Sequence, residues 1–344
     1  LPYDIQIIFI GDINQLPPVF GSSILNYALT QLPIVELTEV YRQKDGSEVL
    51  ENAHKILRGE PVVEGKDFKI IRAGDTQLGQ ERLSLSLGKT FPKWKDSGEY
   101  DPEQDIILSP WNKQDLGTDN INKWIAQYLG QSREADVWEI QAGVQKLYLA
   151  VGDKVMYQKQ TGVIKEIHKN SQYIGKSTKP HSKYLTRFGT YLAGHAVEDD
   201  DDWGDYSHID LDAMMKDDNE DRTKVCSHSV VITMESDEEI TLSSIGDFAQ
   251  QVFSLGYCLT VHKAQGCEWR KVFIILHKDH AISAYRELLY TAVTRAREKV
   301  ILIAKDFMIQ KAIDTQRIKG NTIADKLEYF NSGILNVDNV KCTK

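Results

Sequence analysis

The sequence predicts an α/β protein: a parallel sheet flanked by helices, interrupted by a small β-rich insertion. Residues 5–10 are almost entirely apolar, as expected of a parallel strand that is buried on both faces. Segments with strand and helix patterns alternate up to about residue 155 and again from Phe248 onward, which is typical of a parallel α/β sheet. Between these stretches lie only short β-like pieces, separated by turn-rich or acidic segments, and these indicate the insertion.

The individual elements follow from local patterns. Residues 35–41 read as a second strand, and residues 105–108 as a third, which leads through residues 109–125 into a helix. Ser47 precedes a helix whose apolar residues repeat at helical spacing, and Gly59 lies just past its end. The β-like pieces of the insertion are VMYQ (155–158), GVIKEI (162–167), HSVVITM (228–234) and EITL (239–242).

Composition narrows the class of protein. The 344 residues suffice for about two domains, and the longest apolar run is far shorter than the ~20 residues of a membrane span. We therefore expect no membrane partner, and no signal peptide is visible. Four cysteines without C-x-x-C pairing disfavour a zinc site and fit reduced thiols, so we expect a cytoplasmic protein.

Charge is concentrated in one stretch of the chain. The net charge is −9, and twelve acidic residues lie between positions 198 and 221. Such a block is typical of a solvated loop, the alternatives being a divalent-ion site or a mimic of DNA.

The first motif follows the apolar run, in IIFIGDINQLPPV (7–19). Asp12 and Gln15 lie at the carboxyl end of the expected strand, where open α/β sheets bind ligands. The amide of Gln15 can donate to a γ-phosphate or to an attacking water. The alternative is an ordinary strand-to-loop junction with a buried aspartate.

The second motif is YCLTVHKAQGCEW (257–269). The hydroxyl of Thr260 and the imidazole of His262 can bind successive phosphates of a single strand without reading its bases. Gly266 allows the backbone to approach a ligand closely, and Glu268 can accept a hydrogen bond from a nucleotide hydroxyl. A structural histidine is the alternative for His262.

The third motif is LLYTAVTRARE (288–298), which reads as a helix ending in Arg295 and Arg297 and running into the strand VILIA (300–304). Together the three motifs resemble those of superfamily 1 helicases, subclass B, of the RecD and phage Dda type. The resemblance spans most of residues 5–305. It implies that residues 1–45 end a first RecA-like domain, that 46–155 and 246–330 form a second RecA-like domain, that 156–245 form an inserted SH3-like β-barrel, and that 331–344 form a tail.

The resemblance also implies a role for each motif residue. Arg295 would be the arginine finger that stabilises charge on a transferring phosphoryl group, and Arg42, in LTEVYRQ (37–43), would contact the γ-phosphate. An ordinary surface ion pair is the alternative for Arg42. The implied site has Gln15, Arg42 and Arg295 as catalytic residues, Asp12, Gly266 and Glu268 as nucleotide-binding residues, Asn112, Lys113, Thr260 and His262 as DNA-binding residues, and no metal-binding residue.

The implied activity is 5′-to-3′ helicase movement on single-stranded DNA. ATP and Mg²⁺ would be the cofactors, and replication or recombination proteins in a prokaryotic or phage-infected cell would be further partners. Two alternatives stay open: a non-catalytic DNA-binding fragment, or a motor module of a larger recombination nuclease or relaxase.

A phosphate-binding loop, G-x-x-x-x-G-K-[ST], is missing from the sequence. NSQYIGKS (170–177) lacks the first glycine, and GEPVVEGKD (59–67) is one residue too long and ends in Asp67. We therefore expect the loop and a Mg²⁺-binding acidic motif to precede residue 1, and we expect the chain alone to be inactive as an ATPase.

Overall fold

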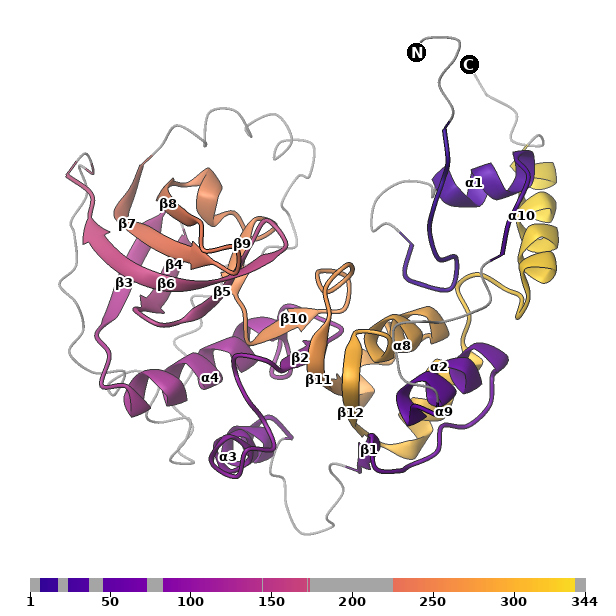
Figure 1. Ribbon diagram of the computed structural model, residues 1–344, viewed down its shortest axis with the longest axis horizontal. Helices are drawn as coiled ribbons and strands as arrows, with labels where there is room; N and C mark the ends of the chain where they lie inside the picture. The colour runs from indigo at the N-terminus through magenta and orange to yellow at the C-terminus, as the bar shows by residue number, and fades with distance from the viewer. Residues whose placement is uncertain are drawn as a thin grey trace. The chain divides into compact units, whose positions relative to one another are not determined.

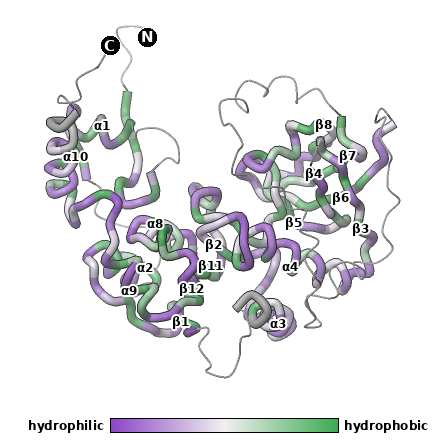
Figure 2. The backbone as a smooth tube through the Cα atoms, turned by 180° about the vertical axis from the view of Figure 1, so that it is seen from behind, coloured by the Kyte–Doolittle hydropathy of each residue, from purple (hydrophilic) through white to green (hydrophobic). Residues whose placement is uncertain are grey.

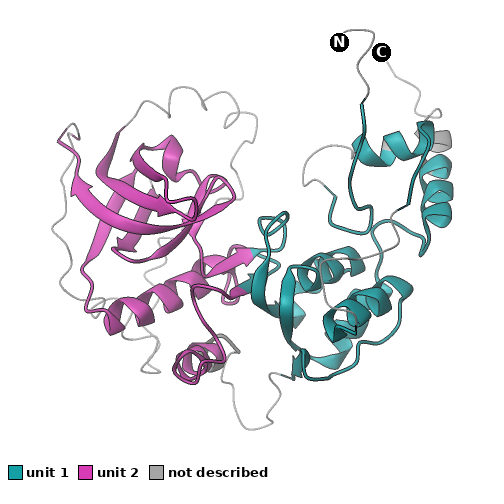
Figure 3. Ribbon diagram, in the orientation of Figure 1, with its two compact units in different colours: residues 1–74, 107–111, 260–344 teal, residues 75–106, 112–259 magenta. Residues whose placement is uncertain are grey.

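The computed structural model describes residues 7–17, 24–36, 46–72, 83–143, 145–171, 173 and 225–337. Two compact units share the chain (Figure 3): unit 1 comprises residues 1–74, 107–111 and 260–344, and unit 2 comprises residues 75–106 and 112–259. Arg42 and the acidic stretch 198–221 lie outside the described residues. No helix in the described part of the chain is long and apolar enough to cross a membrane.

A five-stranded sheet has the order β1-β12-β11-β2-β10, and most of its residues belong to unit 1 (Figure 1). β12 lies between β1 and β11 and pairs with both in parallel, for example Ile70 with Leu302 and Ile274 with Leu302. The α/β class with a parallel sheet is therefore confirmed. The strands are β1 (Phe68–Ile71), β2 (Ile106–Ser109), β10 (Cys258–Thr260), β11 (Trp269–Leu276) and β12 (Ala296–Ala304).

Helices α2 (Glu48–Arg58), α8 (Arg286–Val293) and α9 (Asp306–Asp314) pack beside this sheet, and α1 (Ile24–Gln31) packs against α10 (Ile323–Val337). The helix predicted after Ser47 is confirmed as α2. Ser47 is its N-cap residue, and Gly59 ends it in the left-handed conformation with φ +76°. Val49 and Ile56 on its apolar face are fully buried.

The prediction for residues 5–10 is wrong in the described part. Residues 7–10 form no strand, and their side chains are exposed, Ile8 by 72% and Ile10 by 88%. An apolar run becomes a strand only when a neighbouring strand pairs with its backbone. Within the described residues, no strand pairs with 7–10. The strand expected at 35–41 falls mostly outside the described residues, and 35–36 are irregular.

The third motif is also divided differently from the prediction. α8 ends at Val293, Thr294 is its C-cap, and Arg297 lies in β12 rather than at a helix end. Pairing between strands overrides the helical pattern here, because Ala296 is already in register with Trp269 of β11. The Trp269 N–H also donates to the Arg295 carbonyl at 3.0 Å.

Unit 2 is centred on an antiparallel five-stranded sheet of order β8-β7-β6-β5-β9. The four predicted β-like pieces fall in β5 to β8 and are confirmed as strands. Burial alternates along part of β6 and β7, whereas all four residues of β5 are buried, and hydrophobic and hydrophilic stretches are mixed along these strands (Figure 2). The strands are β5 (Lys154–Tyr157), β6 (Gln160–Lys169), β7 (Val225–Met234), β8 (Glu239–Ser244) and β9 (Phe253–Leu255).

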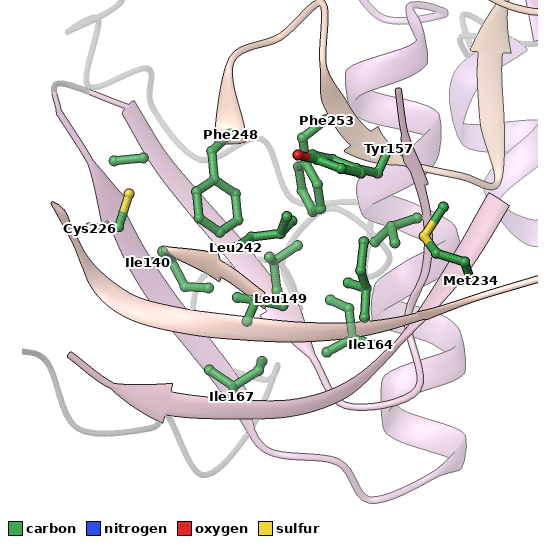
Figure 4. Packing of buried hydrophobic residues seen from close by; sticks show 14 residues of the cluster. Ile140, Leu149, Tyr157, Ile164, Ile167, Cys226, Met234, Leu242, Phe248 and Phe253 are labelled. Atoms are coloured by element: carbon green, nitrogen blue, oxygen red, sulfur yellow. The ribbon is translucent and has the colours of Figure 1, made fainter. Parts of the chain in front are cut away.

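The core of unit 2 lies inside this sheet, where Ile140, Leu149, Leu242 and Phe248 point toward one another (Figure 4). The rings of Phe248 and Phe253 meet edge to face at 5.1 Å. The hairpin of β3 (Val137–Ala142) and β4 (Gln145–Ala150) supplies two of these residues. Two helices, α3 (Leu83–Asp96) and α4 (Thr118–Ser132), and short 3-10 turns at Gly246–Phe248 and Lys278–His280 complete the described elements.

Candidate functional site

The segment 11–17 forms a tight polar turn around Asp12. Its Oδ1 accepts a hydrogen bond from the Asn14 N–H at 2.9 Å, and its Oδ2 accepts one from Gln15 Nε2 at 3.2 Å. The hydroxyl of Tyr290, on α8, donates to the same Oδ2 at 3.2 Å. The predicted pair Asp12 and Gln15 is therefore in direct contact, and Asp12 is exposed.

Leu16 attaches this turn to two distant parts of unit 1. Its N–H donates to Thr291 Oγ1 on α8 at 2.9 Å, and its carbonyl accepts from Gln265 Nε2 at 2.8 Å. These contacts join segments that lie 275 and 249 residues apart in the sequence. The structure thus brings the first, second and third motifs together within unit 1.

The second motif is a compact turn over residues 260–268. Thr260 is 7% exposed, and its Oγ1 accepts from the Lys263 N–H at 3.3 Å while its carbonyl accepts from the Ala264 N–H at 3.0 Å. Gly266 has φ +91°, a left-handed conformation that favours glycine. The turn is therefore fixed by its own hydrogen bonds, with the Gln265 side chain directed to Leu16.

His262 is half-buried on this turn. Burial lowers its pKa from the ordinary value, and the nearby positive charge of Arg317 lowers it further. At neutral pH the imidazole is therefore uncharged. A neutral imidazole offers a phosphate oxygen one N–H donor rather than a cation.

Arg295 is almost fully buried, with 3% exposure. Its Nε donates to the Thr291 carbonyl at 3.1 Å, its Nη1 to the Cys267 carbonyl at 3.2 Å, and its Nη2 to Thr294 Oγ1 at 3.2 Å. The guanidinium thus ties the end of α8 to the 260–268 turn, a contact that its sequence position did not reveal.

Arg297 and Glu268 lie beside each other, close in sequence to the contact between Arg295 and Cys267. Arg297 has an exposed side chain, and its Nε lies 3.8 Å from Glu268 Oε2. Its Nη2 also donates to the Glu268 carbonyl at 3.4 Å. Glu268 is therefore held at the rim of the 260–268 turn by an arginine that is more exposed than Arg295.

Asn112 and Lys113 belong to a turn of unit 2 that precedes α4. Asn112 Oδ1 accepts from Thr118 Oγ1 at 3.1 Å, and Lys113 Nζ lies 3.0 Å from Asp119 Oδ2. A Cβ at Gly117 would overlap the carbonyl oxygens of Asn112 and Lys113, so only glycine fits there. The turn is rigid, and it leaves the Lys113 side chain 70% exposed.

Several contributors to the site escaped the sequence reasoning. Tyr290 and Thr291 of α8 and Lys326 of α10 contact the 11–17 turn, and no local pattern marks these residues as its partners. Among the described residues, no group of three or more His, Cys, Asp or Glu side chains could hold a metal ion. Arg42 lies outside the described residues, so its predicted role stays a prediction.

Comparisons with known proteins match this arrangement of motifs. Residues 255–303, which contain the second and third motifs, match the UvrD-like helicase C-terminal domain. The ATP-dependent RecD2 DNA helicase of Deinococcus radiodurans is 27% identical over 94% of this chain and 36% of its own length. The RecD subunit of the RecBCD enzyme of Mycobacterium tuberculosis is 30% identical over 22% of this chain and 13% of its own length.

Solved structures resemble the chain at lower identity. A Pif1 helicase from Bacteroides, crystallised with ADP-AlF3 and ssDNA, is 16% identical, with a TM-score of 0.44 over 94% of this chain and 66% of that one. The sequence matches agree with the resemblance that its motifs predict: the chain is similar to helicases of the RecD type. It spans about a third of the length of the RecD2 relative.

Proposed function

We propose that the chain is the portion of an ATP-dependent DNA helicase that carries its γ-phosphate-sensing and DNA-gripping motifs, and that the helicase moves 5′ to 3′ along single-stranded DNA. One observation carries the proposal: the backbone of Leu16 joins the Asp12–Gln15 turn to α8 on one side and to the 260–268 turn on the other. A turn able to sense a phosphate is thereby joined to a turn able to grip a strand. The RecD2 relative, described as an ATP-dependent DNA helicase, supports the same activity.

On the nucleotide side of the site, the catalytic residues would be Gln15, Arg295 and Arg42, the last as a further phosphate contact. The nucleotide-binding residues would be Asp12, Gly266 and Glu268. An amide such as Gln15 suits the γ-phosphate because it can both donate and accept hydrogen bonds. Asp12 would take part in nucleotide binding, because its carboxylate is exposed and accessible to bound Mg-ATP. Bound Mg-ATP would supply the phosphoryl group that is transferred to water.

The DNA side would comprise Thr260 and His262 on one turn and Asn112 and Lys113 on the other. Hydroxyl, imidazole, amide and ammonium groups all donate to phosphate oxygens, which gives grip without reading sequence. In this proposal, the antiparallel sheet of unit 2 corresponds to the predicted SH3-like insertion. It would contact the single-stranded DNA. Residues 1–45 would end the first RecA-like domain.

A second candidate is a motor module within a larger recombination enzyme. The match to RecD, named as a subunit of the RecBCD enzyme, favours it, although that match covers only 22% of this chain. A non-catalytic DNA-binding fragment is the third reading. Unwinding by the purified full-length protein without other subunits separates the leading candidate from both.

Strand displacement tests the proposed polarity. The full-length protein that carries this chain, supplied with ATP and Mg²⁺, should unwind a short duplex that has a 5′ single-stranded tail and leave a matched duplex with a 3′ tail intact. Preference for the 3′ tail would reject the polarity, and no unwinding of either duplex would reject helicase activity by the protein alone.

His262 should contribute to DNA affinity rather than to hydrolysis. We expect His262→Ala to weaken binding of an oligonucleotide severalfold to tens-fold, because one phosphate contact is worth ~1–2 kcal/mol. Fluorescence anisotropy with a labelled single strand measures this. His54→Ala is the matched control, since His54 is an exposed histidine on α2. Unchanged affinity in His262→Ala would remove His262 from the DNA contacts.

A further inference from the structure

Helix α10 holds a buried lysine against the Asp12–Gln15 turn. α10 lies beyond residues 255–303, which match the helicase family, and it packs beside α1 (Figure 1). Lys326 is nevertheless 4% exposed, and its Nζ lies 2.6 Å from Asn14 Oδ1 and 3.4 Å from the Ile13 carbonyl oxygen. Lysine is rarely buried unless polar groups pair with its ammonium, and here Asn14 and Ile13 are those partners.

The start of α10 is shaped to aim this side chain. Gly320 has φ +118°, and a Cβ there would lie 2.7 Å from the Asp325 Cβ and 2.8 Å from the Lys326 nitrogen. Asp325 Oδ2 accepts from the Asn321 and Thr322 N–H groups at 3.1 and 3.0 Å. The chain therefore turns sharply into the helix, which places Lys326 in its first turns.

α8 anchors the segment that leads into α10. The Glu287 carboxylate accepts from the N–H groups of Arg317 and Ile318 at 3.1 and 2.9 Å, and Arg286 Nη1 donates to Asn321 Oδ1 at 2.7 Å. α8 also contacts the 11–17 turn through Tyr290 and Thr291. α8 therefore holds the 11–17 turn in two ways. It contacts the turn directly, and it fixes the segment before α10, whose Lys326 also contacts the turn.

Carboxylates partly offset the cost of burying the ammonium. Burial lowers the pKa of Lys326 and the positive charge of Arg286 also lowers it, whereas the carboxylates of Glu287 and Asp12 act in the opposite direction. A hydrogen bond from a charged donor to Asn14 is stronger than one between neutral groups. The contact is therefore suited to fixing the turn in one position.

We propose that Lys326 is a positioning residue, which acts from α10 to hold the 11–17 turn so that Asp12 and Gln15 are aligned for the nucleotide phosphates. The purpose of that alignment rests on the proposed function, whereas the contact itself does not. The first turns of α10 are then a working part of the phosphate-sensing site.

Hydrogen–deuterium exchange on the chain 1–344 tests the contact. In Lys326→Met, the amides of Asn14, Gln15 and Leu16 should exchange about tenfold faster or more, the change expected from the loss of one charge-assisted hydrogen bond. The amides of α10 should keep their protection, and Lys326→Arg should restore slow exchange at the turn. Lys319→Met is the matched control, an exposed lysine close by that should change nothing. Unchanged exchange at the turn in Lys326→Met would overturn the proposal.

Asn14→Ala covers the case in which Lys326→Met loosens α10 itself. It removes the acceptor and leaves α10 intact, so faster exchange at Gln15 and Leu16 supports the proposal and unchanged exchange contradicts it.

In the full-length protein, Lys326→Met should lower kcat for ATP hydrolysis with little change in oligonucleotide affinity or Tm, and Lys326→Arg should rescue it. An unsubstituted protein without ATPase activity would refute the proposed function, while the exchange data would still decide the contact.

Discussion

Replacing Arg295 by alanine should lower DNA-stimulated ATP hydrolysis of the full-length protein by a factor of about 10²–10³, by analogy with arginine fingers in phosphoryl transfer. The charge of such a residue acts chiefly in the transition state, so affinity for single-stranded DNA should change little. Steady-state ATPase rates across DNA concentrations, measured beside fluorescence anisotropy, give both quantities. Loss of DNA binding with retained turnover would reverse the assignment of the motifs to their ligands.

The burial of Arg295 adds a structural consequence to this substitution. Its guanidinium donates to the carbonyls of Thr291 and Cys267, so alanine also removes a tie between α8 and the 260–268 turn. Arg58→Ala is the control, because Arg58 is an exposed arginine on α2 that takes no part in the three motifs. A measured Tm for each variant separates slow catalysis from unfolding: a folded but slow Arg295→Ala supports the catalytic role.

Replacing Asn122 by leucine should destabilise unit 2 by about 3 kcal/mol or more, because each buried backbone group left without a partner costs ~1–3 kcal/mol. Asn122 on α4 is 4% exposed and satisfies three such groups. Its Oδ1 accepts from the N–H groups of Tyr257 and Cys258 at 3.1 and 2.7 Å, and its Nδ2 donates to the Cys258 carbonyl at 2.8 Å. Leucine has a similar branched shape but cannot form a hydrogen bond to any of them.

Urea denaturation of the chain 1–344 followed by circular dichroism measures this loss. Gln131→Leu is the control, since Gln131 is exposed on the same helix. A change of only a few tenths of a kcal/mol in Asn122→Leu would show that water replaces the lost partners and that the site is less enclosed than its burial indicates.

Local patterns predicted much of the fold because they reflect local causes. The helical spacing of apolar residues after Ser47 and the glycine beyond it gave α2, whose buried face includes Val49 and Ile56. Short β-like pieces between turn-rich segments likewise predicted the strands β5 to β8. Residues 7–10 show the limit of such reasoning, since their composition suits a strand but a strand also needs a paired neighbour.

The candidate site was predictable as three motifs but not as an arrangement. Nothing in the sequence near Leu16 indicates Thr291 or Gln265 as its partners, because these contacts depend on how the whole sheet brings distant turns together. Arg295 was singled out by the resemblance of residues 288–298 to a helicase motif, yet its inward contacts follow from the path of the 260–268 turn. Lys326 carried no signal at all, since a lone lysine on a helix usually lies on a solvated face.

ATP hydrolysis by the full-length protein, with and without single-stranded DNA, tests the central claim most directly. For the full-length protein, we expect a hydrolysis rate that rises with DNA concentration to a plateau. For the chain 1–344 alone, we expect no hydrolysis at rates typical of a helicase, because this sequence has no G-x-x-x-x-G-K-[ST] loop. Absence of DNA-stimulated turnover in the full-length protein would contradict the helicase assignment. DNA-stimulated ATP hydrolysis by the chain 1–344 alone would contradict the expectation that the chain needs a phosphate-binding loop that its own sequence lacks.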